Sequence, residues 1–162
     1  MGEKQGNVTF YINDQNSSLN KNNSNRINNK IDTKMDTMKK ICQKYVPNGI
    51  NIDFCKIDIE GGEKGALLGY DFVNYRPKMF CVESTIPNTR SSNFNLWEDI
   101  LIKNDYIFVY SGNVNRYYAD KRIPELLKRC SNFRQYLNNF KIKRLKRYRK
   151  IHRLYNYNIF TQ

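Results

Sequence analysis

The chain has 162 residues, with 28 Lys or Arg, 15 Asp or Glu and a single His, so its formal net charge is +13. This length fits one domain with a modest core. No apolar run approaches the roughly 18 residues that a membrane helix needs, and no signal peptide follows Met1, so we expect a cytoplasmic protein. The single His152 argues against a histidine-centred triad. Four cysteines without a C-x-x-C pair argue against a zinc ribbon or a disulfide scaffold.

The positive charge is concentrated at one end of the chain. Residues 121–162 hold thirteen Lys or Arg and one acid, Glu125, whereas residues 1–120 are almost neutral. We therefore divide the chain into a body, 1–120, and a basic helical tail, 121–162. A Pro in the first turn predicts a helix that starts at Pro124. Further on, Lys141–Lys150 interleaves Ile142, Leu145 and Tyr148 with bases, which predicts a basic helix with a narrow apolar stripe.

The first part of the body carries no residues that point to a particular chemistry. Val8–Ile12 is a strand candidate. Residues 20–33 are rich in Asn and poor in apolar side chains, and we expect a loop there. Lys34–Tyr45 has apolar residues at helical spacing and ends before Pro47, so it is predicted to be an amphipathic helix.

The middle of the chain alternates between strand and helix patterns. This order predicts a parallel α/β sheet whose last strand turns back antiparallel through a hairpin. The predicted elements are a strand over Ile50–Ile59, a short helix through Leu67 and Leu68, a strand over Lys78–Glu83, a helix over Phe94–Lys103, and strands over Tyr106–Tyr110 and Arg116–Ala119.

Acidic residues follow two of these strands. Asp58 and Glu60 come at the end of the first strand and Glu83 at the end of the second. Ligands of open α/β sheets bind outside the carboxyl ends of the strands, where such carboxylates orient an acceptor, take a proton or bind a hard cation. The alternative is that Glu60 and Glu63 complement the N-terminus of the following helix, and for Glu63 this alternative has the greater weight. The adjacent glycines lack the spacing of a phosphate-binding loop.

The same region carries a distinctive motif, Ile52-Asp-Phe-Cys-Lys-Ile-Asp-Ile-Glu-Gly-Gly-Glu63, followed by Leu67-Leu-Gly69. This motif resembles the central signature of the FkbM family of S-adenosylmethionine-dependent methyltransferases. The similarity extends over roughly residues 7–120. It also includes Tyr75-Arg-Pro-Lys78, Glu83-Ser-Thr85, Pro87-Asn-Thr89, Trp97-Glu98 and Asn115-Arg-Tyr-Tyr118.

The resemblance implies strands four to seven of a seven-stranded, Rossmann-like class I methyltransferase sheet, the last strand antiparallel. It implies S-adenosylmethionine as cofactor and a hydroxyl (or amine) of a sugar or secondary metabolite as acceptor. It also implies no metal ion. By this resemblance Asp58, Glu60 and Glu83 are the catalytic residues, with Asp58 also beside the cofactor. The substrate-binding residues would be Glu63, Asn115 and Arg116.

The sequence lacks the glycine-rich turn and the ribose-binding acid that come first in this family. The resemblance therefore implies that the chain corresponds to the C-terminal part of such an enzyme, without the N-terminal cofactor-binding half. In that case the Ile52–Ile59 strand has an open edge with apolar surface beside it. We expect the chain to self-associate or to pair with a complementary N-terminal half.

Two other functions remain open. In the first, the chain is a non-enzymatic binding module in which residues 141–153 hold nucleic acid or an anionic membrane surface. A purely structural interpretation has more weight, in which the tail packs its apolar stripe on the sheet. The second is a divalent-metal nuclease built on the same acids, which has little support because no lysine follows Glu83 at the usual spacing.

Overall fold

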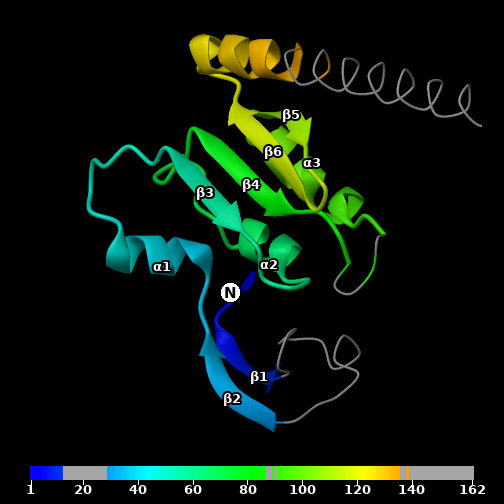
Figure 1. Cartoon of the computed structure of the whole chain (residues 1–162). Helices are drawn as coiled ribbons and strands as arrows, with labels where there is room; N and C mark the ends of the chain where they lie inside the picture. Colours follow the sequence, from blue (N-terminus) through cyan, green and yellow to red (C-terminus); the bar gives the residue numbers. More distant parts are fainter. Residues whose placement is uncertain (13–28, 87–88, 90, 136–137, 139–162) are drawn as a thin grey trace, which may run out of the picture.

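The structure is a computed structural model, and it describes residues 1–12, 29–86, 89, 91–135 and 138. Its centre is a four-stranded mixed sheet of order β3-β4-β6-β5 (Figure 1). The strands are β3 (Phe54–Ile57), β4 (Met79–Glu83), β5 (Tyr106–Ser111) and β6 (Asn115–Asp120). β3 pairs with β4 in parallel, and β6 lies antiparallel between β4 and β5. The predicted α/β class and the antiparallel last strand are confirmed.

Helices cover one face of this sheet. They are α2 (Glu63–Leu68) and α3 (Glu98–Lys103), the latter preceded by a short 3-10 turn, η2 (Phe94–Leu96). The core consists of side chains from this face of the strands packed against both helices. Its fully buried members include Ile57, Leu67, Phe80, Val82, Trp97, Leu101, Tyr106 and Tyr118. Phe80 and Tyr106 meet edge to face, with ring centroids 4.9 Å apart.

A separate hairpin precedes the sheet and extends away from it (Figure 1). It consists of β1 (Gly6–Ile12) and β2 (Asn29–Met35), paired antiparallel from Gly6 with Met35 to Ile12 with Asn29. The strand predicted over Val8–Ile12 is therefore confirmed, but the predicted loop over 20–33 is wrong for residues 29–33. All of these residues except Ile31 are polar, and all of them are exposed, so their strand depends on pairing with β1 rather than on a buried face. The rest of that loop lies outside the described residues.

Three predicted elements are shorter in the structure than in the sequence pattern. Helix α1 runs over Met38–Tyr45 and not from Lys34, because β2 continues to Met35 and Thr37 caps the helix by accepting a hydrogen bond from the Lys40 N–H (3.3 Å). The first sheet strand begins at Phe54 and not at Ile50. The helix predicted over Phe94–Lys103 is divided into η2 and α3 at Trp97, whose φ of −143° is not helical.

The start of the chain is anchored on α2 by glycines. Gly2 donates its N–H to the Asp36 carbonyl (3.1 Å), and its backbone lies directly against Gly65 and Gly69. A methyl group on Gly69 would collide with the Gly2 carbonyl oxygen. The glycines after the acidic motif therefore permit a close backbone approach, a role unrelated to phosphate binding.

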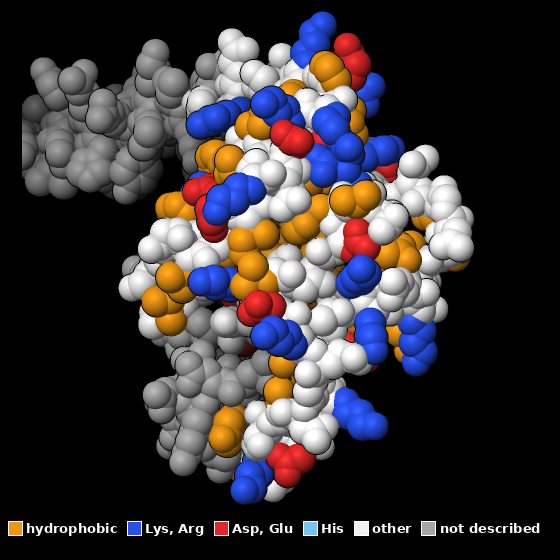
Figure 2. Space-filling view, turned by 180° about the vertical axis from the view of Figure 1, so that it is seen from behind, with side chains coloured by type: hydrophobic (Ala, Val, Ile, Leu, Met, Phe, Trp, Pro, Cys, Tyr) orange, Lys and Arg blue, Asp and Glu red, His pale blue; other side chains and the backbone are white. Residues whose placement is uncertain are grey.

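Residues 124–135 form a helix after β6, as the Pro124 signal predicted. Lys128, Arg129 and Arg134 on it are exposed, and Figure 2 shows Lys and Arg side chains gathered over this end of the molecule. The basic segment 141–153 lies outside the described residues. Among the helices that the structure describes, none is long and apolar enough to cross a membrane.

Candidate active site

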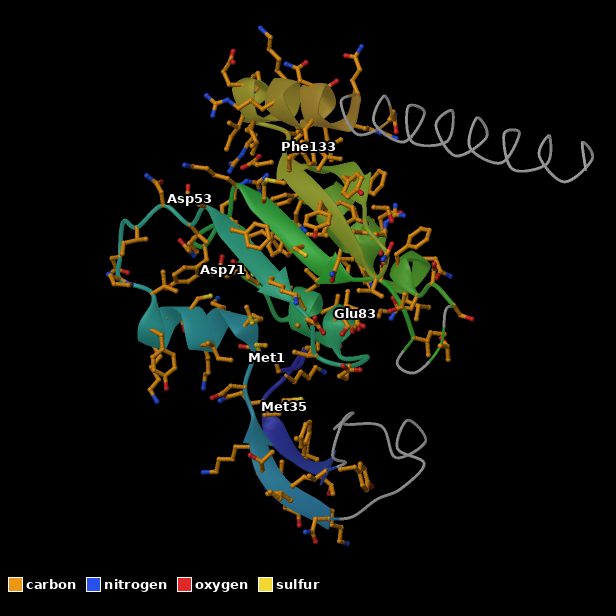
Figure 3. The ribbon with its side chains drawn as sticks, in the orientation of Figure 1. Met1, Met35, Asp53, Asp71, Glu83 and Phe133 are labelled. Atoms are coloured by element: carbon orange, nitrogen blue, oxygen red, sulfur yellow. The ribbon has the colours of Figure 1, made fainter. Side chains whose placement is uncertain are left out.

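Three carboxylates meet where the parallel strands end. Asp58 directly follows β3, Glu60 lies two residues on, and Glu83 is the last residue of β4. Figure 3 shows Glu83 at this end of the sheet. Because β3 and β4 are parallel, their carboxyl ends lie at the same edge of the sheet. One oxygen from each of the three side chains lies within 4.8 Å of the others. The proximity that the strand pattern predicts for these acids is thus present.

The loop between β3 and α2 is held by a fourth acid, Glu63. This first residue of α2 is only 1% exposed. Its Oε1 accepts hydrogen bonds from the backbone N–H groups of Ile59 (3.2 Å) and Gly61 (3.1 Å). The turn is tight, with positive φ at Glu60 (54°) and Gly61 (98°). Since Glu63 already occupies these N–H groups, they are not available to a phosphate or carboxylate ligand.

The crowding of acids changes their proton affinity. Burial raises the pKa of Glu83 to about 7, helped by the negative charges of Asp58, Glu60 and Glu63, while a hydrogen bond from Thr85 opposes the shift. Burial also raises the pKa of Glu60, with Asp58 and Glu63 adding to the effect.

Two contacts reduce the electrostatic repulsion among these carboxylates. The Lys56 ammonium lies 2.8 Å from Asp58 in a half-exposed ion pair. The Thr85 hydroxyl donates to Glu83 Oε1 at 3.3 Å. Neither residue was predicted from the sequence to contact these acids. Lys56 could have been found from strand alternation, because residues two apart on a strand share a face.

The other oxygen of Glu83 is in an unusual position. Glu83 Oε2 is buried and has no hydrogen-bond partner among the described residues. Asn115 is paired with Glu83 across β4 and β6, and its Oδ1 is likewise buried without a partner in the described part of the chain. A buried polar atom without a partner costs free energy. Both atoms are acceptors, so a ligand that donates hydrogen bonds, or a cation, would satisfy them.

Arg116 is not directed at this cluster. Its guanidinium is sandwiched between the rings of Phe94 and Phe108, 3.8 and 4.0 Å from their centroids. Its Nη2 donates to Glu98 Oε1 at 2.7 Å, and its Nε donates to the Tyr118 hydroxyl at 2.9 Å. These contacts join β6 to α3 and β5. Of the six residues singled out from the sequence, the structure therefore brings Asp58, Glu60, Glu63, Glu83 and Asn115 together and leaves Arg116 apart.

This arrangement suits two kinds of chemistry. A carboxyl group that titrates near neutral pH can take a proton from a bound hydroxyl or amine. The neighbouring carboxylates can orient a group that donates hydrogen bonds, and oxygen ligands at this spacing also suit a hard cation. A polyphosphate does not fit, because its charge would be repelled.

The chain was compared with known proteins. The model of the methyltransferase FkbM domain matches residues 2–108, which include the hairpin, the acidic loop and β4. No curated protein and no solved structure matches. The match covers well over half of the chain and ends before Asn115 and Arg116. The chain belongs to the FkbM methyltransferase family.

Proposed function

We propose that the chain takes part in methyl transfer from S-adenosylmethionine to a hydroxyl or amine of an acceptor such as a sugar or secondary metabolite. The observation that carries the proposal is Glu83, a carboxyl group with a pKa of about 7 at the edge of the sheet where ligands of such folds bind. Perturbed carboxyls in such places are candidates for acid–base roles. The strand order β3-β4-β6-β5 supports equating these strands with strands four to seven of a Rossmann-like methyltransferase sheet.

The residues present fit one end of the cofactor. The carboxylates, with the free acceptor atoms of Glu83 and Asn115 in the described part of the chain, suit a cationic group and hydrogen-bond donors. The nucleoside end is different: the sequence lacks a G-x-G-x-x-G turn, and Glu63 fills the loop amides between β3 and α2. When bound, the cofactor supplies the methyl group. Asp58 is the residue we place beside it.

The chain's own residues receive the following roles. Glu83 takes the proton that the acceptor hydroxyl or amine loses, and Asp58 and Glu60 orient that group for attack. Asn115 Oδ1 accepts a hydrogen bond from the acceptor. Glu63 positions the loop that carries Glu60.

The remaining part of the cofactor site would come from a polypeptide that pairs with β3. In the described residues β3 is an edge strand of its sheet, and Phe54 on it is 51% exposed. Edge strands with apolar neighbours are templates for further pairing. A second copy of the chain or a complementary N-terminal half are the occupants we propose.

The test begins with calorimetric titration of the full chain with S-adenosylmethionine. Micromolar binding corresponds to about −8 kcal/mol. Transfer of labelled methyl to a panel of polyhydroxylated acceptors is then measured between pH 5.5 and 9, and we expect the rate to rise through about pH 7 and level off, because Glu83 must be ionised. Glu83→Gln should abolish transfer, whereas the exposed Asp99→Asn on α3 should leave it unchanged. Absence of binding by a folded chain, alone and with added N-terminal half, would contradict the proposal.

A further inference from the structure

The two faces of the four-stranded sheet differ in their covering. α2 and α3 cover the face that carries Phe80 and Val82. Alternation puts the neighbouring residues Met79 and Cys81 on the opposite face. There a cavity of about 380 Å³ lies between the strands and the helix of residues 124–135. Its lining is almost entirely apolar and includes Phe54, Met79, Tyr110, Tyr117, Cys130 and Phe133.

This cavity is open and incompletely filled. Phe54 on β3 and Phe133 on the helix are 51% and 55% exposed. Phe133 lies near Tyr110, with ring centroids 6.4 Å apart, and makes a first contact between the helix and this face. Exposed aromatic side chains around a hollow of this size indicate a surface that another group of atoms covers.

The same face changes from apolar to acidic along the strands. Phe54, Lys56 and Asp58 alternate along β3, and on β4 the sequence Met79, Cys81, Glu83 lies beside them. At about 3.3 Å per residue, roughly 13 Å separate the apolar end from the carboxylates. An occupant of this face would therefore need both apolar side chains and positive charge.

The chain itself contains a segment with this composition. Residues 139–162, which lie outside the described part, continue from the helix whose Phe133 already contacts this face. They hold eight Lys or Arg and no acid. Ile142, Leu145 and Tyr148 recur at every third position, and Ile151 and Leu154 continue the series. Twenty-four residues are more than long enough to reach across the sheet.

We propose that residues 139–162 bind in cis to this open sheet face. Their apolar residues would lie in the cavity lined by Phe54 and Tyr117, and their bases would face the carboxylates of Asp58 and Glu83. Three observations carry it: the continuity of the chain, the half-open apolar cavity, and the complementary charges at one end of that cavity. The bases of the segment would then offset part of the negative charge of the acidic cluster. Residues 139–162 would thus be an intramolecular partner of the candidate site.

The test places a photo-crosslinking benzoylphenylalanine at Phe54 of the full chain. We expect crosslinking to a peptide within residues 139–162 of the same molecule, identified by mass spectrometry of the monomer band. Mixing light and ¹⁵N-labelled chains separates crosslinks within a chain from those between chains. The matched control is benzoylphenylalanine at Ile102, which is equally exposed (50%) but lies on α3, on the helical side of the sheet. It should not capture the segment.

A second set of variants addresses the segment directly. Ile142→Ser with Leu145→Ser should reduce the yield of the Phe54 crosslink about tenfold or more, because each lost apolar side chain weakens docking by that order. Lys143→Ser, at a polar position between them, should leave most of the crosslink yield unchanged. A benzoylphenylalanine at Leu145 should in turn capture peptides of β3, β4 or β6. Crosslinks between two chains would overturn the proposal in favour of self-association, and the absence of any crosslink to residues 139–162 would overturn it outright.

Discussion

Carboxyl groups lie at both ends of the four-stranded sheet, and their surroundings shift their pKa values in opposite directions at the two ends. Where the parallel strands begin, Asp120 is 3% exposed and accepts hydrogen bonds from Arg76 (2.7 and 3.0 Å) and from Arg122. Burial alone would raise the pKa of Asp120, but hydrogen bonds and the charge of Arg76, with the Arg122 N–H, lower it overall. Where the parallel strands end, burial and neighbouring acids raise the pKa of Glu83.

The difference separates a structural carboxylate, Asp120, from Glu83, the carboxyl group that we propose to be functional. At the first end Asp120 is paired with both Arg76 and Arg122, and Arg76 also lies over the ring of Tyr106, 4.7 Å from its centroid. At the second end Lys56 pairs with Asp58, and Glu83 Oε2 is buried without a hydrogen-bond partner among the described residues. Compensated charge stabilises a fold, whereas incompletely compensated charge in an accessible place is typical of a site that awaits a ligand.

The largest expected effect is at the compensated end. Asp120→Ala would leave the largely buried Arg76 without its carboxylate, and loss of one partner of a buried ion pair costs roughly 3–5 kcal/mol of unfolding free energy. Urea unfolding followed by circular dichroism measures it. The matched control is Asp99→Ala, which breaks an exposed pair with Lys103 on α3 and should cost well under about 1 kcal/mol. Equal losses in the two variants would remove the distinction between the two ends.

The second effect concerns the support of the acidic end. Gly69→Ala would push the chain at Gly2 away from α2, and a forced methyl group in a tight contact costs about 1–3 kcal/mol. Gly65→Ala meets Gly2 only at an ordinary distance of 3.5 Å, and it should stabilise α2 by roughly 0.5–1 kcal/mol because alanine favours a helix more than glycine. Thermal unfolding compares the two variants. A neutral Gly69→Ala would show that the N-terminal segment does not pack on α2.

The third effect is a pH dependence at the acidic end. The pKa of Glu83 rises from an ordinary 4.5 to about 7 on folding, so its protonated form stabilises the folded state below pH 4.5. This contribution is lost as the pH rises to about 7. Because Glu83 is only partly buried, we expect a loss of about 1–2 kcal/mol over this range, after allowing for screening by solvent. Glu83→Gln should flatten the curve of unfolding free energy against pH, and an unchanged slope in the variant would contradict the assignment.

The smallest effect concerns Arg116. Arg116→Lys keeps the charge but loses the planar stack between Phe94 and Phe108, which should lower stability by about 1 kcal/mol. If Arg116 only joins β6 to α3, acceptor KM should stay within about twofold, which is under 0.5 kcal/mol. A large rise in KM with unchanged stability would restore the substrate-binding role that the family resemblance implies.

The sequence was sufficient for the features that depend on local pattern. Alternating strand and helix signals predicted the sheet and its antiparallel last strand, and the rule for parallel strand ends predicted that Asp58, Glu60 and Glu83 would meet. Features that depend on distant contacts were missed. The strand over residues 29–33 exists because β1 pairs with it, and its polar sequence looks like a loop. The placement of Arg116 depends on Phe94 and Phe108, which come from separate elements.

The glycines after the acidic motif give a similar lesson. Their spacing excluded a phosphate loop, but the sequence alone did not indicate what they are for. The structure shows that Gly65 and Gly69 accept the backbone of Gly2, more than sixty residues earlier in the chain. Likewise, Glu63 accepts hydrogen bonds from the N–H groups of a tight turn in which Glu60 and Gly61 have positive φ. A glutamate at position 60 gives no sign of this conformation in the sequence.

The central claim is that the negative charge of Glu83, at the acidic end of the sheet, is incompletely compensated. The most direct test is a ¹³C NMR titration of the glutamate side-chain carboxyls in the full chain, with the Glu83 resonance assigned by its loss in Glu83→Gln. The account predicts a midpoint near 7 for Glu83 and a lower midpoint in Asp58→Asn, because a neighbouring negative charge is removed. A midpoint near the ordinary 4.5, unchanged in Asp58→Asn, would contradict it.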